Sequence, residues 1–124
     1  MPPTPQKVNL AEKLALFADH WNPRVVGELN GQQVKAVKLL GAFVWHKHNA
    51  EDELFLVVRG RLRMEFEHGR HVDVSPGEFI IVPRGVSHRP VAEEEVHVVL
   101  FEPGSTLNTG DVRNERTVER LERI

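Results

Sequence analysis

The sequence contains no cysteine, and this absence excludes two kinds of chemistry. Without thiols the 124-residue chain forms no disulfide bond and offers no thiolate to a metal ion. Any metal site must therefore be built from nitrogen and oxygen ligands.

The chain also lacks long hydrophobic runs and an excess of one charge. No apolar stretch approaches the roughly 20 residues that a membrane-spanning helix needs. The proline-rich start, residues 1–5, has neither the basic nor the apolar region of a signal peptide. Sixteen basic and eighteen acidic side chains give a net charge of −2, so no nucleic-acid groove is expected. These absences predict a cytoplasmic protein that binds neither membranes nor nucleic acid.

The composition is that of one globular domain. Hydrophobic residues make up 40% and charged residues 27% of the chain, which is an ordinary balance for a folded protein. A chain of this length can form one core but is too short for two ordinary domains. We predict an N-terminal tail over residues 1–8 and a single domain over residues 9–124.

The hydrophobic spacing predicts one short helix followed by strands. Asn9 and Glu12 form a capping-box pattern ahead of apolar residues at helical intervals, so a helix is expected over about residues 9–18. From Arg24 onwards, short alternating segments are separated by glycine and proline turns, with Asn30-Gly31 as the strongest hairpin signal. Strands at even spacing predict an antiparallel all-β sandwich or barrel. The expected strands are residues 24–29, 32–40, 42–47, 53–59, 62–67, 70–74, 78–82 and 96–101, with a last strand or helical turn over 117–124.

Three histidines and one glutamate form a candidate metal site. His46 and His48 flank a single residue, and the two-residue period of a strand sends both imidazoles to one face. Glu53 begins the next strand, and His88 follows a Pro/Gly turn later in the chain. Three neutral imidazoles and one carboxylate suit Mn, Fe, Co, Ni, Cu or Zn. Taken alone, however, a histidine pair in a charged stretch is more often a surface feature.

The remaining histidines have less specific surroundings. His68 and His71 flank a turn at a charged hairpin tip, where they are expected to be solvated, and His20 follows the helix in a polar linker that suits a structural role. His97 alternates with two valines and therefore faces away from them. It is either a pocket residue or a hydrogen-bonded core histidine. From strand parity, His97 and, as a weaker candidate, Glu65 are the possible acid–base residues.

The residues around the candidate ligands resemble the two motifs of the cupin superfamily. The first motif reads GAFVWHKHNAEDELFLVVRG over residues 41–60, and the second reads GEFIIVPRGVSHRPVA over residues 77–92. Two departures are visible, since Gly41 lies one residue closer to His46 than in the family and Ala92 replaces an asparagine. Neither departure removes a ligand of the family pattern.

This resemblance implies a cupin double-stranded β-helix, or jelly-roll barrel, with a short N-terminal helix. It also implies one divalent metal ion held by His46, His48, Glu53 and His88. The rival carboxylates Glu51 and Asp52 are less suitable, because only Glu53 keeps the six-residue spacing to the next motif glycine. The resemblance further implies a homodimer, and the apolar run over residues 54–58 predicts that the outer face of this strand is covered by the N-terminal segment or by a second subunit.

A divalent ion with these four ligands keeps a formal charge of +1 and open coordination positions. Such a site favours a small anionic or bidentate oxygen ligand. We therefore predict a metal-dependent enzyme, either an oxidoreductase of the dioxygenase type or an isomerase, that acts on a small oxygenated metabolite. The alternative is a non-catalytic module that binds or senses a small molecule or a metal, because this fold is a poor guide to activity.

Overall fold

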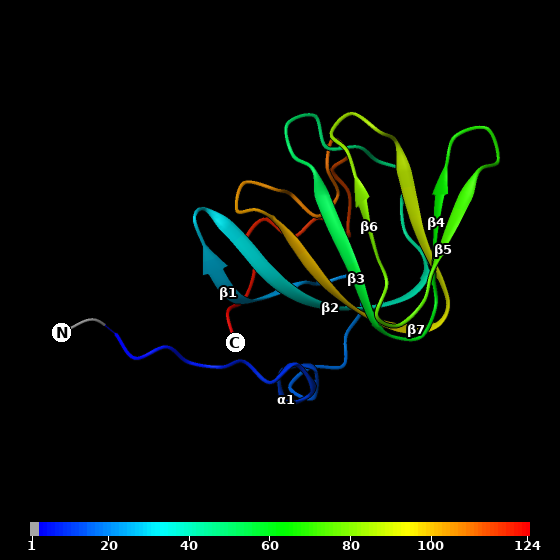
Figure 1. Cartoon of the computed structure of the whole chain (residues 1–124). Coiled ribbons are helices and arrows are strands. Elements are labelled where there is room, and N and C mark those ends of the chain that lie inside the picture. Colours follow the sequence, from blue (N-terminus) through cyan, green and yellow to red (C-terminus); the bar gives the residue numbers. More distant parts are fainter. Residues whose placement is uncertain (1–2) are drawn as a thin grey trace.

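The computed structural model describes residues 3–124 as a mostly β-structure with one short helix (Figure 1). Met1 and Pro2, which belong to the predicted tail, lie outside the described residues. Residues 3–8, the rest of that tail, are exposed and have no regular secondary structure. The elements are α1 (Leu10–Leu14), β1 (Arg24–Leu29), β2 (Gln32–Ala42), β3 (Glu53–Arg59), β4 (Leu62–Phe66), β5 (His71–Val74), β6 (Phe79–Val82) and β7 (His88–Pro103).

Strand β7 connects the two parts of the sheet. It pairs with β2 from Val91 to Pro103, while β3 pairs with its C-terminal half and β4 pairs with its N-terminal end. Strand β6 then pairs with β3, and β5 pairs with β4, all antiparallel. The strand order is β1-β2-β7-β3-β6, with β4 and β5 attached to β7 off this path. The predicted all-β architecture with one short helix is confirmed, but the sheet is not closed by hydrogen bonds.

The helix is shorter than its hydrophobic spacing predicts. Asn9 caps it as expected, because its side-chain oxygen accepts a hydrogen bond of 3.1 Å from the backbone N–H of Glu12. The helix nevertheless ends at Leu14, which is its only buried residue, while Leu16 is exposed. Of the predicted helix beyond Leu14, only Phe17 packs against the sheet, and this single contact does not extend the helix. This five-residue helix is far too short to cross a bilayer, and the described part of the chain has no helix that is long and apolar enough to do so.

The strand predicted over residues 42–47 is wrong. Strand β2 continues through Gly41, whose positive φ of 86° accompanies a register shift, and ends at Ala42. Residues 43–52 form a loop in which only His46 makes an isolated bridge, to His88. Strand β7, in turn, is longer than the predicted 96–101. The last segment, 117–124, contributes a single bridge between Val25 and Arg123 rather than a strand or helical turn.

The core lies between the inner faces of the strands. Inward side chains such as Val37 on β2, Val57 on β3 and Val98 on β7 form one buried apolar cluster. On the outer face, Leu14 and Phe17 pack against Val26 on β1 and Ala36 on β2. The N-terminal segment therefore covers the β1–β2 part of the outer face.

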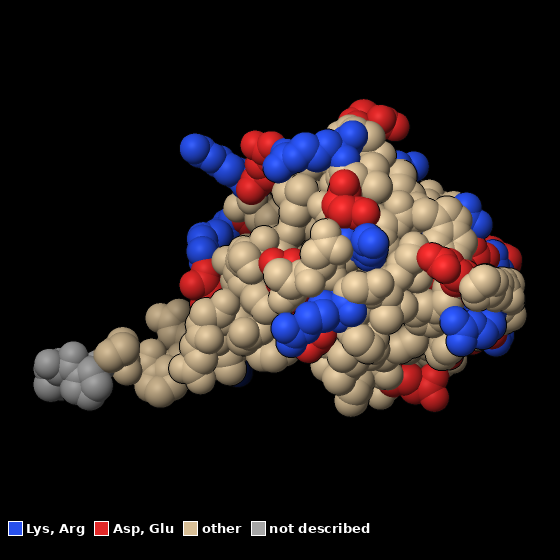
Figure 2. Space-filling model, turned by 90° about the horizontal axis from the view of Figure 1, so that it is seen from above, with Lys and Arg blue, Asp and Glu red and all other residues tan. Residues whose placement is uncertain are grey.

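The surface mixes charges of both signs. In the view of Figure 2, lysine and arginine side chains alternate with aspartate and glutamate over the visible face. The face shown has no broad patch of a single sign.

Candidate metal centre

Two backbone hydrogen bonds place His46 beside His88. The N–H of His46 donates to the His88 carbonyl at 3.1 Å, and the N–H of His88 donates to the His46 carbonyl at 2.9 Å. The loop that carries His46 and His48 is thus fixed against the first residue of β7. The Gly85 N–H also donates to the His48 carbonyl at 2.8 Å, so the turn before β7 holds the second histidine. Glu53, the first residue of β3, completes the group.

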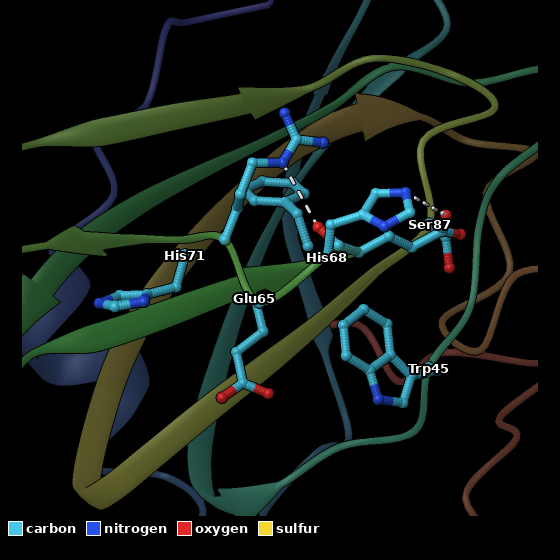
Figure 3. Close-up of a pocket in the computed structure, with 9 residues that line it drawn as sticks. Trp45, Glu65, His68, His71 and Ser87 are labelled. Carbon is cyan, nitrogen blue, oxygen red and sulfur yellow. Dashed lines mark hydrogen bonds and ion pairs between the residues drawn. The ribbon is translucent and has the colours of Figure 1, made fainter.

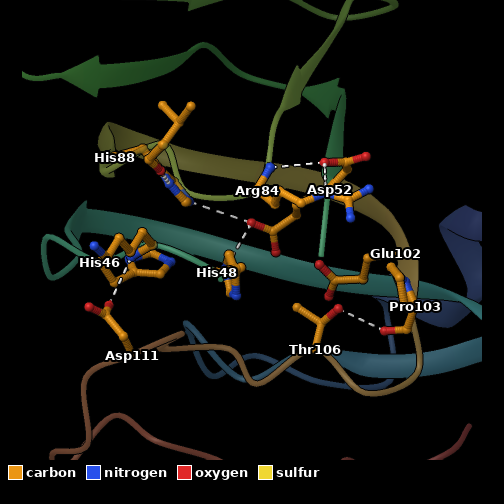
Figure 4. A network of polar contacts seen from close by, with 12 residues as sticks. His46, His48, Asp52, Arg84, His88, Glu102, Pro103, Thr106 and Asp111 are labelled. Carbon is orange, nitrogen blue, oxygen red and sulfur yellow. Dashed lines mark hydrogen bonds and ion pairs between the residues drawn. The ribbon is translucent and has the colours of Figure 1, made fainter. Parts of the chain in front are cut away.

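The four predicted ligands converge on one point inside the sheet. One nitrogen or carboxylate oxygen from each of His46, His48, Glu53 and His88 lies within 4.8 Å of all the others. Nε2 of His48 lies 3.3 Å from Oε1 of Glu53, and Nε2 of His88 lies 3.5 Å from the same oxygen (Figure 4). None of the four residues is more than 4% exposed. We call these four residues the buried cluster.

The unpaired atoms of the buried cluster fit a metal ion. Both ring nitrogens of His48, Nε2 of His88 and Oε1 of Glu53 are buried and have no hydrogen-bond partner within residues 3–124. Buried polar atoms in folded proteins are normally hydrogen-bonded, so four orphaned atoms at one place require an explanation. Nitrogen and carboxylate donors that face one point are the ligand set of a divalent transition metal. The cluster can therefore hold one such ion.

Backbone carbonyls orient two of the imidazoles. Nδ1 of His46 donates to the Val44 carbonyl at 2.9 Å, and Nδ1 of His88 donates to the Val86 carbonyl at 2.9 Å. Because a carbonyl oxygen only accepts, Nδ1 carries the proton in both rings, and each Nε2 presents a lone pair. This arrangement fixes the tautomer and the ring orientation that a metal ligand needs.

The charge state of the cluster also suits a cation. Burial, followed by the proximity of His88, lowers the pKa of His46 from 6.5 to about 4, so this imidazole is neutral near pH 7. Burial alone would raise the pKa of Glu53, but the proximity of Glu102, His48 and His88 outweighs burial and holds the pKa well below its usual range. Glu53 is therefore a carboxylate in the folded protein.

Sequence reasoning missed a buried lysine–glutamate pair beside the cluster. Nζ of Lys35 lies 2.7 Å from Oε1 of Glu102, and both side chains are buried. Burial and repulsion from Glu53 raise the pKa of Glu102 well above its usual range. The alternation of side chains along a strand could have indicated their burial. Lys35 shares a face with the buried Val37, and Glu102 shares a face with the buried Leu100.

The two candidate acid–base residues lie outside the buried cluster. His97 faces away from the buried Val96 and Val98, and its Nε2 contacts Oε1 of Glu95 at 2.9 Å. The carboxylate of Glu65 accepts hydrogen bonds from Arg89 and Arg63.

The rival carboxylates are also apart from the cluster. Glu51 accepts a hydrogen bond from the Ser105 hydroxyl, and Asp52 accepts one from the Arg84 backbone N–H. Of the three neighbouring acids, only Glu53 belongs to the buried cluster.

A small cavity adjoins the cluster. Its volume of about 30 Å³ is roughly the space of one water molecule. Trp21 and Phe43, stacked with ring centroids 4.6 Å apart, form part of the wall. Apart from His46, Glu53 and Asn108, the lining is apolar: Trp21, Pro23, Val37, Leu39, Phe43, Phe55, Pro90 and Leu100.

A larger hollow of about 560 Å³ lies at the β4–β5 hairpin (Figure 3). The residues that line it include Trp45, Glu65, His68, His71 and Ser87, which are labelled in Figure 3. The histidines His68 and His71 are exposed there, as the sequence predicted. We call this second site the hairpin hollow.

Comparison with known proteins identifies related chains and folds. The family model described as "Cupin domain" matches residues 38–103. A crystal structure of a cupin-2 domain containing protein from Shewanella frigidimarina is similar to the chain, with 42% identity and a TM-score of 0.76, over 77% of this chain and 93% of that one. Hydroquinone 1,2-dioxygenase, crystallised with Cd²⁺ and 4-hydroxybenzonitrile, has a TM-score of 0.66 at 21% identity over 78% of this chain and 72% of its own; this likeness shows the fold alone.

Curated relatives match shorter stretches. Homogentisate 1,2-dioxygenase of Bradyrhizobium diazoefficiens is 47% identical over 45 residues, which are 36% of this chain and 10% of that protein. An uncharacterized protein of Bacillus subtilis is 30% identical over 64 residues, 52% of this chain and 57% of its own length. The match thus spans a little over half of one curated relative and a tenth of the other.

Proposed function

Since the chain belongs to the cupin domain family, we propose that its buried cluster binds one divalent metal ion and that the protein is a metal-dependent dioxygenase-type oxidoreductase. The observation that carries this proposal is the convergence of four buried ligand atoms, most of them without a hydrogen-bond partner in the described chain. Between the two reaction types predicted from the sequence, the stretch shared with homogentisate 1,2-dioxygenase favours the dioxygenase.

The chain's own residues have separable tasks in this proposal. His46, His48, Glu53 and His88 hold the ion, which when bound supplies Lewis-acid and redox chemistry. The carbonyls of Val44 and Val86 keep two of the imidazoles in the required tautomer. Apolar side chains around the adjoining cavity exclude water from the cluster.

The charge of the site supports a class of substrate. Three neutral imidazoles and one carboxylate leave a divalent ion with a formal charge of +1. A small oxygenated metabolite that is anionic, or that offers two oxygen atoms, is the ligand that this charge favours.

The size of the adjoining cavity favours a second candidate function. A space of about 30 Å³ admits roughly one water molecule, so a substrate enters only if the wall around Trp21 moves. A non-catalytic module that binds or senses a metal needs no such movement.

Elemental analysis and oxygen uptake distinguish the two functions. Protein purified without a histidine tag is expected to carry one redox-active metal ion per chain. With a panel of small diols, hydroxy acids and 2-oxo acids it is expected to consume oxygen, and the uptake should stop on chelation. Metal without oxygen uptake or product would favour the non-catalytic module, while protein that takes up no divalent metal would contradict both.

We further propose that the chain forms a homodimer through the outer face of β3 and β6. Cross-strand pairs place Leu54 beside Ile81 and Leu56 beside Phe79 on this face. Phe79 is 59% exposed and Ile81 is 53% exposed, so a second copy would cover side chains that the N-terminal segment leaves uncovered. Strand β6 also ends the strand order, so its free edge continues the apolar face, and a twofold axis can pair like with like.

Substitution on this face tests the dimer. Phe79→Lys is expected to shift the mass measured by light scattering from dimer to monomer. Val72→Lys is the matched control, because Val72 is 45% exposed but lies on β5. A wild-type monomer, or a dimer that survives Phe79→Lys and Ile81→Lys together, would rule out this interface.

A further inference from the structure

Trp21 lies between two spaces in the protein. One is the cavity of about 30 Å³ beside the buried cluster, which we call the inner cavity, and the other is a more open hollow of about 340 Å³, which we call the outer hollow. Within residues 3–124, Trp21 is the only residue that lines both. The outer hollow has roughly ten times the volume of a water molecule, so it has room for a small metabolite, whereas the inner cavity does not.

The backbone of Trp21 is strained. It belongs to the segment between α1 and β1, which has no regular secondary structure, and its φ of 62° is unfavourable for a bulky residue. Its backbone N–H donates to the Lys38 carbonyl and its indole N–H donates to the Leu40 carbonyl, both at 2.9 Å. The ring also stacks on Phe43. Relief of the strain offsets part of the loss of these contacts, so movement of Trp21 costs less than the contacts alone indicate.

Arg116 presents an unpaired nitrogen beside Trp21. It lines the outer hollow, and its guanidinium carbon lies 5.6 Å from the ring centroid of Trp21 and 5.7 Å from that of Phe43. Nη1 of Arg116 is buried and has no hydrogen-bond partner within the described chain, although buried polar atoms are normally paired. A guanidinium group matches a carboxylate through two parallel hydrogen bonds. Arg116 is therefore suited to bind the carboxylate of a small molecule.

Other charged residues of the outer hollow have partners or are exposed. Asp19 is paired with Arg24, and His20 contacts Glu95 at 2.8 Å. Glu115 is exposed, so solvent and salt screen its charge. Arg116 is thus the residue of the outer hollow that is best placed to bind an anion.

The segment that carries Arg116 is fixed close to the buried cluster. The Asn108 side chain, which lines the inner cavity, donates to the Arg116 carbonyl at 2.7 Å and accepts from the Val118 N–H at 2.9 Å. The N–H of Lys47, which lies between two histidines of the cluster, donates to the Asp111 carboxylate at 2.9 Å (Figure 4). The backbone of this segment is therefore held in place, while the guanidinium of Arg116 is free to meet a ligand.

We propose that Arg116 binds the carboxylate at one end of the substrate, and that the other end reaches the metal ion when the Trp21 ring moves aside. This inference rests on the proposed metal-dependent function. It narrows the substrate class to small dicarboxylates that carry a chelating pair of oxygen atoms at one end. Arg116 determines specificity in this role, and it does not touch the ion.

Isothermal titration of the Zn²⁺-loaded full chain tests the role of Arg116. The probes are 2-oxoglutarate and 2-oxopentanoate, which share the carbon chain and the 2-oxo acid group but differ in the carboxylate at the far end. We expect the wild type to prefer 2-oxoglutarate by about 10- to 100-fold, the usual contribution of a charge-assisted contact. Arg116→Gln should bind both acids about equally. Arg113→Gln is the matched control and should keep the preference, because Arg113 lies on the same segment but pairs with Glu119.

Fluorescence tests the movement of Trp21. The chain has two tryptophans, so Trp45→Phe leaves Trp21 as the only tryptophan. Saturation with 2-oxoglutarate is expected to shift its emission to longer wavelength, because the ring leaves Phe43 and contacts water. Trp21→Phe, which retains Trp45, is the control and should show no such shift. An emission spectrum that stays the same while the acid binds would exclude the movement.

The titration also separates this inference from the metal assignment. A Zn²⁺-loaded wild type that binds neither acid or both equally, or an Arg116→Gln variant that keeps the preference, would overturn the role of Arg116 and leave the metal site intact. A wild type that takes up no Zn²⁺ would overturn both. If Arg116→Gln fails to fold, Arg116→Met replaces it with the same expectation, because methionine keeps an apolar stem over the two rings.

Discussion

The buried cluster and the hairpin hollow are built from the same kinds of side chain, but their surroundings differ. Both combine histidines with a glutamate. In the hairpin hollow, His68 and His71 are exposed to solvent and Glu65 is held by two arginines. In the cluster, the histidines and Glu53 are buried, and several of their polar atoms lack partners within the described residues (Figures 3 and 4).

This contrast shows which property identifies a metal site. Exposed polar groups satisfy their hydrogen bonds with water at little cost, whereas a buried group without a partner is costly. The larger hollow is therefore the weaker candidate, although its volume is many times that of the cavity beside the cluster. Unpaired ligand atoms that share one buried point are the stronger indication.

The comparison predicts opposite results for histidine substitutions in the two regions. His88→Ala should weaken divalent metal binding by at least about 100-fold, because even residues that only support ligands contribute about 10- to 100-fold. His71→Ala should leave the affinity unchanged. Isothermal titration with Zn²⁺ and with Mn²⁺ measures both. Equal affinities in the two variants would remove the distinction between the regions.

Metal removal should lower the stability of the folded protein. At a free metal concentration of 100 times Kd, binding to the folded state alone adds about 2.7 kcal/mol to the free energy of unfolding. Chelation of the wild type should therefore lower the thermal midpoint, and His88→Ala should show no such response. A midpoint that is insensitive to chelation in the metal-loaded wild type would mean that the ion binds elsewhere or not at all.

Two glycines, one in each region, provide a further test of this difference. Gly110 and Gly69 both have positive φ, at 57° and 69°, so alanine is strained at either position by about 1–2 kcal/mol. A Cβ on Gly110 would also collide with the Lys47 carbonyl and come within 3.0 Å of the His46 ring, whereas a Cβ on Gly69 meets nothing within 4 Å. We expect Gly110→Ala to lose roughly 2 kcal/mol more than Gly69→Ala in urea unfolding. Equal losses would show that the C-terminal segment does not restrain the cluster loop.

The smallest expected effect concerns a glutamate on the outer face. Hydrogen bonds from His20 and then His97 lower the pKa of Glu95 from 4.5 to about 2. A lowered carboxyl pKa stabilises the folded state above the unfolded value, and this contribution is lost as the pH falls from 4.5 towards 2. Because the Glu95 side chain is 44% exposed, screening limits the contribution to about 1 kcal/mol or less.

The corresponding measurement compares Glu95→Gln with the wild type. The wild type should be slightly more stable near pH 7, and the difference should shrink as the pH is lowered through the window given above. A difference in stability that grows as the pH falls from 4.5 towards 2 would contradict the assignment of the charge to Glu95.

The four residues of the buried cluster were predictable, although the reason given for their convergence was partly wrong. Strand parity predicted that His46 and His48 would share a face, but these residues lie in a loop that is fixed by backbone hydrogen bonds to β7. Motif spacing predicted the four residues that converge, because it depends on the number of residues between turns rather than on the local conformation. The shortened α1 follows the same rule, since its cap is local and its length depends on packing.

The local features of this protein follow from short stretches of its sequence. Asn9 caps the helix, Asn30-Gly31 connects β1 to β2, and the spacing of the two motifs identifies the four residues of the buried cluster. The pairing of Lys35 with Glu102, 67 residues away, and the burial of both side chains follow only from the tertiary fold. The physical reason is that turns and caps depend on neighbouring residues, whereas the loss of water around a charge depends on residues that are distant in the chain.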